Sequence, residues 1–154
     1  MCYYKNGDSG RASDSDVTSG SCYAANQTSV DYRANADGDT MDKAADADVV
    51  LFFVSTSSGE GFDRTSLSYS SDDEDSLSKL AGAVGNKVVV CAVSPGAVLM
   101  PWKDDVASIL LSFMPGQMYS FGLAELLFGD VSPSGRLPLT LPNKENEQEF
   151  TQEQ

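Results

Sequence analysis

The sequence predicts an α/β fold: an open, mostly parallel sheet of about five or six strands, with helices on both faces (an α/β sandwich). Three apolar runs carry this prediction, at residues 49–54, 87–93 and 107–113, and each one ends in a loop that contains glycine or proline. Short runs of β-formers bounded by turn residues are typical of strands buried on both faces of a parallel sheet. Helix-compatible segments lie between and around these runs, which favours alternating strands and helices.

Two helices are expected around the first apolar run. Residues 37–48 contain Met and Ala at helical spacing and predict a short helix directly before this run. A second helix should begin near Ser70 or Ser71, because the four acidic residues that follow favour the positive end of a helix and Leu77 and Leu80 continue the period.

The two ends of the chain give other signals. Residues 1–28 mix Gly, Ser, Asp and Asn without a period and are interpreted as irregular, followed by a short strand at 30–33. Apolar residues at helical spacing predict a helix over 119–128. A proline-bounded strand is expected at 135–142, at a sheet edge because proline has no N–H to donate.

These elements divide the chain into three parts. Residues 1–43 form an irregular, acidic N-terminal segment, and residues 44–142 form the α/β sandwich. Residues 143–154 lack a core-forming pattern and are interpreted as an extended tail or linker.

Composition restricts the classes of function. The 154 residues carry a formal net charge of −13, which argues against nucleic acid or an anionic membrane surface as a partner. No apolar stretch approaches the roughly 18 residues of a membrane span. The chain has no histidine and no C-x-x-C spacing, so we expect no metal site and no cofactor, and acid–base chemistry falls to carboxylates.

The cysteines and one short motif bear on the compartment. Cys91 lies within an apolar run and is interpreted as a small core residue, whereas Cys2 and Cys22 are able to pair if the compartment is oxidising. Asn26, Gln27 and Thr28 match the N-glycosylation acceptor pattern, which favours a secreted or lumenal location.

The loop after the first apolar run is the candidate site. Glu60 lies there between Gly59 and Gly61, at the carboxyl end of a predicted buried strand, where parallel sheets bind ligands. Asp63 and Arg64 supply charges that could orient a carboxylate or a sugar hydroxyl. In the alternative interpretation, Glu60 only pairs with Arg64 and the loop is a turn.

Four motifs, taken together and in this order, resemble a known family. They are G-E-G-F-D-R at 59–64, P-W at 101–102, M-P-G-Q at 114–117 and L-F-G-D-V-S-P-S-G-R-L-P at 127–138. In this order they resemble the second domain of glycoside hydrolase family 3, the β-glucosidase family, over residues 44 to 150.

The resemblance implies a six-stranded α/β sandwich that packs on an amino-terminal (β/α)8 barrel, with the active site in the cleft between them. It implies a retaining mechanism in which the barrel supplies a nucleophilic aspartate and this domain supplies the acid/base, mapped here to Glu60. The implied substrate is a β-linked glucoside or oligosaccharide, with Asp63 and Arg64 as substrate-binding residues.

Two functions follow from these observations. In the first, the chain is the second (C-terminal) domain of a retaining β-glucosidase-like glycoside hydrolase, and the isolated chain is inactive because one glutamate cannot perform a two-carboxylate reaction. In the second, it is a non-catalytic structural or partner-binding module of a larger assembly. Its surface around Phe62, Tyr69 and Trp102, which a barrel domain covers in the first function, would then be covered by another protein subunit.

Overall fold

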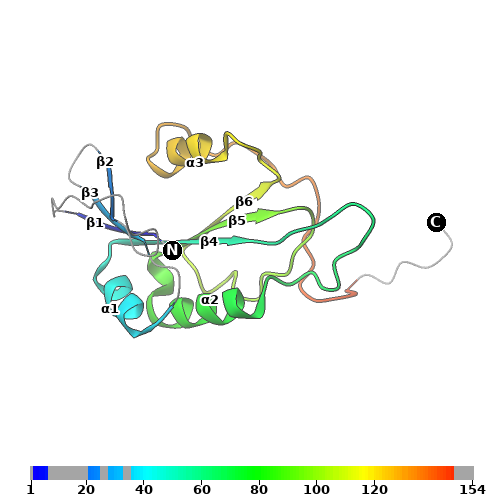
Figure 1. Ribbon diagram of the computed structural model, residues 1–154, viewed down its shortest axis with the longest axis horizontal. Helices are drawn as coiled ribbons and strands as arrows, with labels where there is room; N and C mark the ends of the chain where they lie inside the picture. The colour runs from blue at the N-terminus through cyan, green and yellow to red at the C-terminus, as the bar shows by residue number, and fades with distance from the viewer. Residues whose placement is uncertain (1, 7–20, 25–27, 33–35, 148–154) are drawn as a thin grey trace.

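The computed structural model describes residues 2–6, 21–24, 28–32 and 36–147, with side chains described from residue 36 onward (Figure 1). The predicted pairing of Cys2 with Cys22 and the glycosylation motif at Asn26 lie outside the described side chains. The elements are β1 (Cys2–Asn6), β2 (Ser21–Ala24), β3 (Thr28–Tyr32), α1 (Gly38–Asp46), β4 (Val49–Ser55), α2 (Ser71–Val84), η1 (Gly85–Lys87), β5 (Val88–Ser94), β6 (Ser108–Phe113) and α3 (Tyr119–Leu127).

The sheet has a parallel part and an antiparallel part, in the strand order β2-β3-β1-β4-β5-β6. Only β4, β5 and β6 run parallel, with Val50 opposite Val88 and Val89 opposite Ser108. β1, β2 and β3 pair antiparallel and extend the sheet beyond β4. The α/β fold with a parallel sheet is confirmed, but its parallel part holds three strands, and the expectation of a mostly parallel sheet of five or six is wrong in this respect.

The first residues also differ from the prediction. Residues 1–28 were expected to be irregular, whereas β1 and β2 form there. Their sequences lack a long apolar run, and they are strands because they pair with β3 and β4, which local periodicity does not reveal. The domain boundaries at residues 43 and 142 stay predictions.

Helices lie on both faces of the sheet, α1 and α2 on one and α3 on the other (Figure 1). The core lies chiefly between α1, α2, β4 and β5. Its buried members are Ala44, Ala47, Val50, Phe52, Val54, Tyr69, Leu77, Leu80, Val84, Val88, Val90, Ala92, Val98 and Trp102. Cys91 is buried in β5, as predicted for a core residue.

β4 is buried on one face only. Val50, Phe52 and Val54 point into the core, whereas Phe53 on the opposite face is 41% exposed. The strand was expected to be buried on both faces because its sequence is continuously apolar. An apolar run shows that burial is favourable but does not supply the neighbour that covers the second face.

Helices α1 and α2 each begin directly after a residue whose side chain caps the helix. The side chain of Asp37 accepts a hydrogen bond from Thr40 N at 2.9 Å at the start of α1. At the start of α2, Ser70 Oγ accepts from Asp73 N at 3.2 Å and donates to the Asp73 carboxylate at 2.6 Å. These contacts satisfy N–H groups that have no partner within the helix, which confirms the predicted start at Ser70.

Residues 135–142 do not form the predicted edge strand. Pro138 and Pro142 cannot donate to a ladder, and the segment instead places Leu137 and Leu141 at the wall of a cavity beside β6. Two of the apolar residues that predicted a strand therefore line this cavity without pairing with a neighbouring strand.

The connection from β5 to β6 carries no helix. Residues 95–107 return to the start of β5, where Ala107 N donates to Val88 O at 2.9 Å. This path brings the Asp105 carbonyl against the end of α2, so that a Cβ added at the buried Gly85 would lie 2.0 Å from that oxygen. Gly85 therefore permits a close approach of two backbone segments.

We expect Gly85→Ala to lower the free energy of unfolding by about 1–3 kcal/mol, because a backbone oxygen has to move. Gly82→Ala, at an exposed position of α2 where a Cβ meets nothing within 4 Å, should raise it by about 0.4–1 kcal/mol. Urea denaturation of both variants of the 154-residue chain measures the difference. Equal effects at the two positions would contradict the close approach.

Candidate functional site

The loop that carries Glu60 follows β4 and ends at α2. Gly59 and Phe62 form an isolated antiparallel bridge, and Gly61 has φ 86°, a left-handed conformation that favours glycine. A Cβ on Gly59 would lie 2.3 Å from the Phe62 ring, so the ring packs on the glycine backbone. This tight turn leaves Glu60 exposed at its tip.

Arg64 ties this loop to the loop after β5. Its Nη2 donates to the Ala97 carbonyl at 2.5 Å, while Nη1 is buried without a hydrogen-bond partner in the described part of the chain. No ion pair joins Arg64 to Glu60 within residues 36–147, so the alternative interpretation of a Glu60–Arg64 pair is wrong. Asp63, three residues after Glu60, is exposed.

Tyr69 and Trp102 lie beneath the loop instead of on its surface. They are 5% and 3% exposed, and their ring centroids are 6.3 Å apart. Burial raises the pKa of Tyr69 to about 12, and the positive charge of Arg64 partly opposes this shift. The predicted exposed surface around Phe62, Tyr69 and Trp102 is therefore reduced to Phe62, and a sugar cannot stack on Trp102.

Sequence reasoning missed a further contact of the loop. Glu145 Oε1 accepts hydrogen bonds from Ser66 Oγ at 2.8 Å and from Leu67 N at 2.7 Å. These hydrogen bonds, first that of the Leu67 N–H, hold the pKa of Glu145 below its usual value, and Arg64 acts in the same direction. Residues 143–147 were expected to be an extended tail, and nothing local in the sequence indicates this distant partner.

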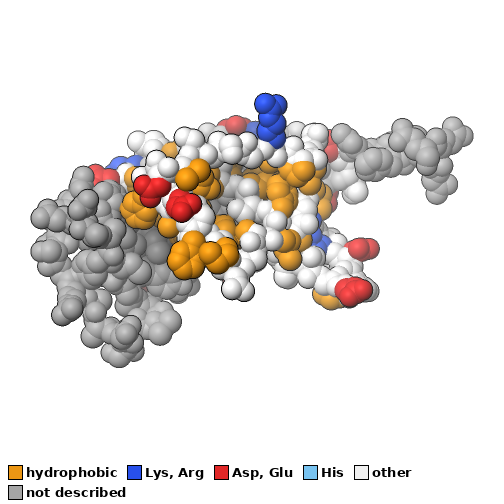
Figure 2. All heavy atoms as spheres, turned by 90° about the horizontal axis from the view of Figure 1, so that it is seen from above, with side chains coloured by type: hydrophobic (Ala, Val, Ile, Leu, Met, Phe, Trp, Pro, Cys, Tyr) orange, Lys and Arg blue, Asp and Glu red, His pale blue; other side chains and the backbone are white. Residues whose placement is uncertain are grey.

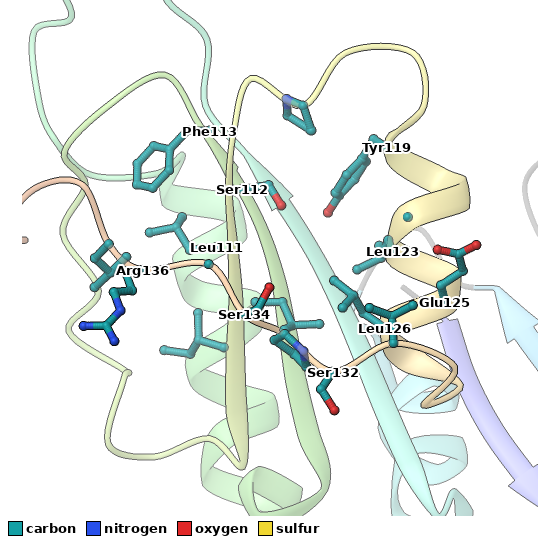
Figure 3. A pocket seen from close by; sticks show the side chains of 18 of the residues that line it. Leu111, Ser112, Phe113, Tyr119, Leu123, Glu125, Leu126, Ser132, Ser134 and Arg136 are labelled. Atoms are coloured by element: carbon teal, nitrogen blue, oxygen red, sulfur yellow. The ribbon is translucent and has the colours of Figure 1, made fainter.

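A separate cavity of about 830 Å³ lies between β6, α3 and residues 131–141 (Figure 3). Its walls are mostly apolar, with Leu111 and Leu123 on facing elements. The Tyr119 hydroxyl is buried there and points toward Ser112; burial raises its pKa, and Ser112 opposes the shift. None of residues 56–70 lines this cavity, so it is distinct from the Glu60 loop.

The face around α3 is rich in exposed hydrophobic side chains. Figure 2 looks onto this side and shows hydrophobic groups gathered there. The exposed large hydrophobic residues of this region are Met114, Met118, Phe121, Phe128, Val131 and Leu137. Several large hydrophobic side chains exposed on one face are typical of a surface that contacts other protein.

Two classes of feature are missing from the described residues. No group of three or more Cys, Asp or Glu side chains among them is placed to hold a metal ion. No helix in that part of the chain is long and apolar enough to cross a membrane.

Comparison with known proteins assigns the family. Residues 6–154 match the family described as the glycosyl hydrolase family 3 C-terminal domain. The chain belongs to this family. The match begins well before residue 44, so it includes β2 and β3, which the motif resemblance left out, and only the last residue of β1.

Curated relatives of this glycosyl hydrolase family 3 domain include proteins named as β-glucosidases. It is 39% identical over 112 residues to the probable beta-glucosidase F of Neosartorya fischeri. The aligned region covers 65% of this chain and 13% of that protein. It is 34% identical over 123 residues to the thermostable beta-glucosidase B of Acetivibrio thermocellus. The aligned region covers 73% of this chain and 16% of that protein. The chain thus spans only a small part of the length of these relatives.

Solved structures show the same fold. The family 3 domain matches DesR, a β-glucosidase from Streptomyces venezuelae in complex with D-glucose, with a TM-score of 0.66 and 30% identity over 79% of this chain and 16% of that one. It matches the β-D-glucoside glucohydrolase of Trichoderma reesei with a TM-score of 0.66 and 28% identity, over 75% of this chain and 18% of that one.

The raised pKa of Tyr69 predicts a loss of stability at alkaline pH. Its folded pKa lies above the unfolded value of 10.0, so its contribution is fully present below pH 10 and is lost as the pH rises through about 12. Between these limits the wild-type chain should lose about 2–3 kcal/mol more unfolding free energy than Tyr69→Phe. Parallel curves for the two proteins in denaturant titrations would show that the hydroxyl is not buried.

Proposed function

We propose that this chain is the second domain of a retaining β-glucosidase-like glycoside hydrolase and that Glu60 is its general acid/base. One observation carries the proposal: in a chain of this family, Glu60 lies exposed at the tip of a glycine-flanked loop at the carboxyl end of β4. No hydrogen bond or ion pair in the described residues engages its carboxylate. It is therefore available to a substrate held against this edge of the sheet.

The chemistry needs a second carboxylate. In a retaining reaction two carboxyl groups lie about 5–5.5 Å apart; one attacks the anomeric carbon while the other protonates the leaving oxygen. The protonating group then removes a proton from the water that releases the sugar. In this proposal Glu60 performs both proton transfers, and the nucleophilic aspartate belongs to a barrel domain that forms the other wall of the cleft.

The proposed substrate is a β-linked glucoside. Support comes from the β-glucosidase relatives and from the glucose complex of the related DesR structure. Asp63 is exposed in the same loop as Glu60 and is proposed to accept a hydrogen bond from a sugar hydroxyl. Arg64 is proposed to contribute its positive charge to the same subsite while it holds the loop through Ala97.

A non-catalytic, partner-binding module is the second candidate. The observation in its favour is the apolar surface around α3, together with Phe62, which is 69% exposed. Both proposals require another protein surface against this domain: the barrel domain at the Glu60 loop in the first, and a separate subunit in the second. They differ in whether Glu60 is needed for hydrolysis.

We expect the 154-residue chain alone to hydrolyse an aryl β-glucoside no faster than buffer. A lone acid lacks the covalent route that splits the reaction into two easier steps. Release of the aryl alcohol by purified chain, followed over several concentrations, is the measurement. Hydrolysis that scales with protein and disappears in Glu60→Gln would contradict the proposed division of labour between two domains.

A chimera tests Glu60 directly. Residues 36–147 replace the matching region of the thermostable beta-glucosidase B of Acetivibrio thermocellus, which is 34% identical to this chain. Glu60→Gln in this chimera should lower kcat/KM about 10²-fold or more for glucosides with poor leaving groups, and far less for activated aryl glucosides, because only poor leaving groups need the proton. Steady-state kinetics with both substrate types gives the comparison.

The matched control is Asp104→Asn, which removes an exposed carboxylate paired only with neighbouring Lys103 and should leave both rates unchanged. Equal slowing of both substrates by Glu60→Gln would mean that Glu60 does not act as the acid. A wild-type chimera that is folded by circular dichroism but inactive would favour the non-catalytic module.

A further inference from the structure

The Glu60 loop is held by contacts that all lie away from its tip. Thr56 N donates to Val93 O at 3.3 Å at its start, and Leu99 N donates to Leu67 O at 3.1 Å near its end. Arg64 adds the bond to Ala97. These contacts join the loop to β5 and to the segment that follows β5. The loop has one further anchor, in the C-terminal segment.

Glu145 supplies that anchor. Its Oε1 accepts from both Ser66 Oγ and Leu67 N, and Ser66 Oγ in turn accepts from Ser68 N at 3.0 Å. Leu67 is thus held by both of its backbone polar groups, because its N–H donates to Glu145 and its carbonyl accepts from Leu99 N. Figure 1 shows the C-terminal segment, coloured orange to red, beside the green loop that leads into α2.

A second glutamate shapes the segment that presents Glu145. Glu147 accepts from Asn143 N at 2.6 Å and from Asn143 Nδ2 at 3.1 and 3.3 Å. Asn146 completes this turn with φ 52°, a left-handed conformation that asparagine tolerates better than most residues. The hydrogen bonds of Asn143 hold the pKa of Glu147 below its usual value. Residues 143–147 therefore form a closed turn with Glu145 on its surface.

The positive charge of Arg64 and the solvent exposure of Glu145 indicate that this contact acts locally on the loop. Arg64, four residues after Glu60 in the same loop, is the cation that favours ionised Glu145. Glu145 is exposed, so its hydrogen bonds compete with water and contribute little to the stability of the whole fold. Their effect is local, because they restrict a loop whose tip has no other anchor among these contacts.

We propose that Glu145 is a positioning residue for the Glu60 loop, and that the turn at residues 143–147 clamps this loop at Ser66 and Leu67. The clamp itself follows from the hydrogen bonds, whereas its effect on catalysis rests on the proposed role of Glu60. Precise placement matters because a proton donor has to lie within hydrogen-bond distance of the leaving oxygen.

The clamp is tested first in the 154-residue chain by amide hydrogen exchange. Glu145→Ala should increase exchange of the Leu67 amide about tenfold or more, since this N–H loses its acceptor. Amides within α2 should not change, and Asp104→Asn should leave Leu67 unaffected. An unchanged Leu67 amide, or faster exchange throughout the chain, would overturn the clamp.

Positioning is tested in the chimera with the same substrate pair as for Glu60. Glu145→Ala should lower kcat for poor leaving groups several-fold with KM nearly unchanged, and should have less effect on activated substrates. Glu145→Gln keeps an oxygen that accepts both hydrogen bonds and should recover most of the lost rate. A merely structural residue would not show this split by leaving group.

The outcomes separate the two proposals. An active chimera that depends on Glu60 but is indifferent to Glu145→Ala would overturn positioning alone. If the folded wild-type chimera is inactive, or Glu60→Gln slows both substrates equally, the proposed function fails and the catalytic part of this inference fails with it. The Leu67 amide still decides, in that case, whether the clamp exists.

Discussion

The parallel pairing of β4, β5 and β6 is the constraint on which the other features depend. Val50 opposite Val88, and Val89 opposite Ser108, place the carboxyl ends of all three strands at one edge of the sheet. The loops that follow these strands therefore emerge together. That shared edge brings Arg64 to Ala97 and Leu67 to Leu99, although each pair is separated by more than one secondary-structure element.

Different forces hold the core and the loop that carries Glu60. The core is an apolar layer between the sheet and helices α1 and α2, and it excludes water from residues such as Leu80 and Val90. The loop is held by hydrogen bonds of Arg64, Leu67 and Glu145, at the border with solvent. Such contacts tolerate adjustment more readily than close packing does, which suits a loop that meets a ligand or another domain.

The two faces of the sheet differ in how completely other elements cover them. Helices α1 and α2 pack on one face, whereas the other leaves Phe53 partly exposed and carries an open cavity of about 830 Å³ between β6 and α3. Exposed Met118 and Phe121 continue this apolar surface. A domain that spans 13% to 18% of the length of its relatives is consistent with such a surface, because the remaining parts of those proteins have to pack somewhere.

The sequence by itself determined the features that local pattern encodes. The three apolar runs became β4, β5 and β6, the Ser70 cap started α2, and Gly61 beside Glu60 takes the positive φ that glycine permits. Only the tertiary structure decided that β1 and β2 are strands, that residues 135–142 pack without pairing, that Trp102 is buried, and that Glu145 binds Leu67. The physical reason is the same in each case. Periodicity and capping report on neighbours in the chain, whereas pairing, coverage of a face and contacts between distant residues depend on where the fold brings separate segments together.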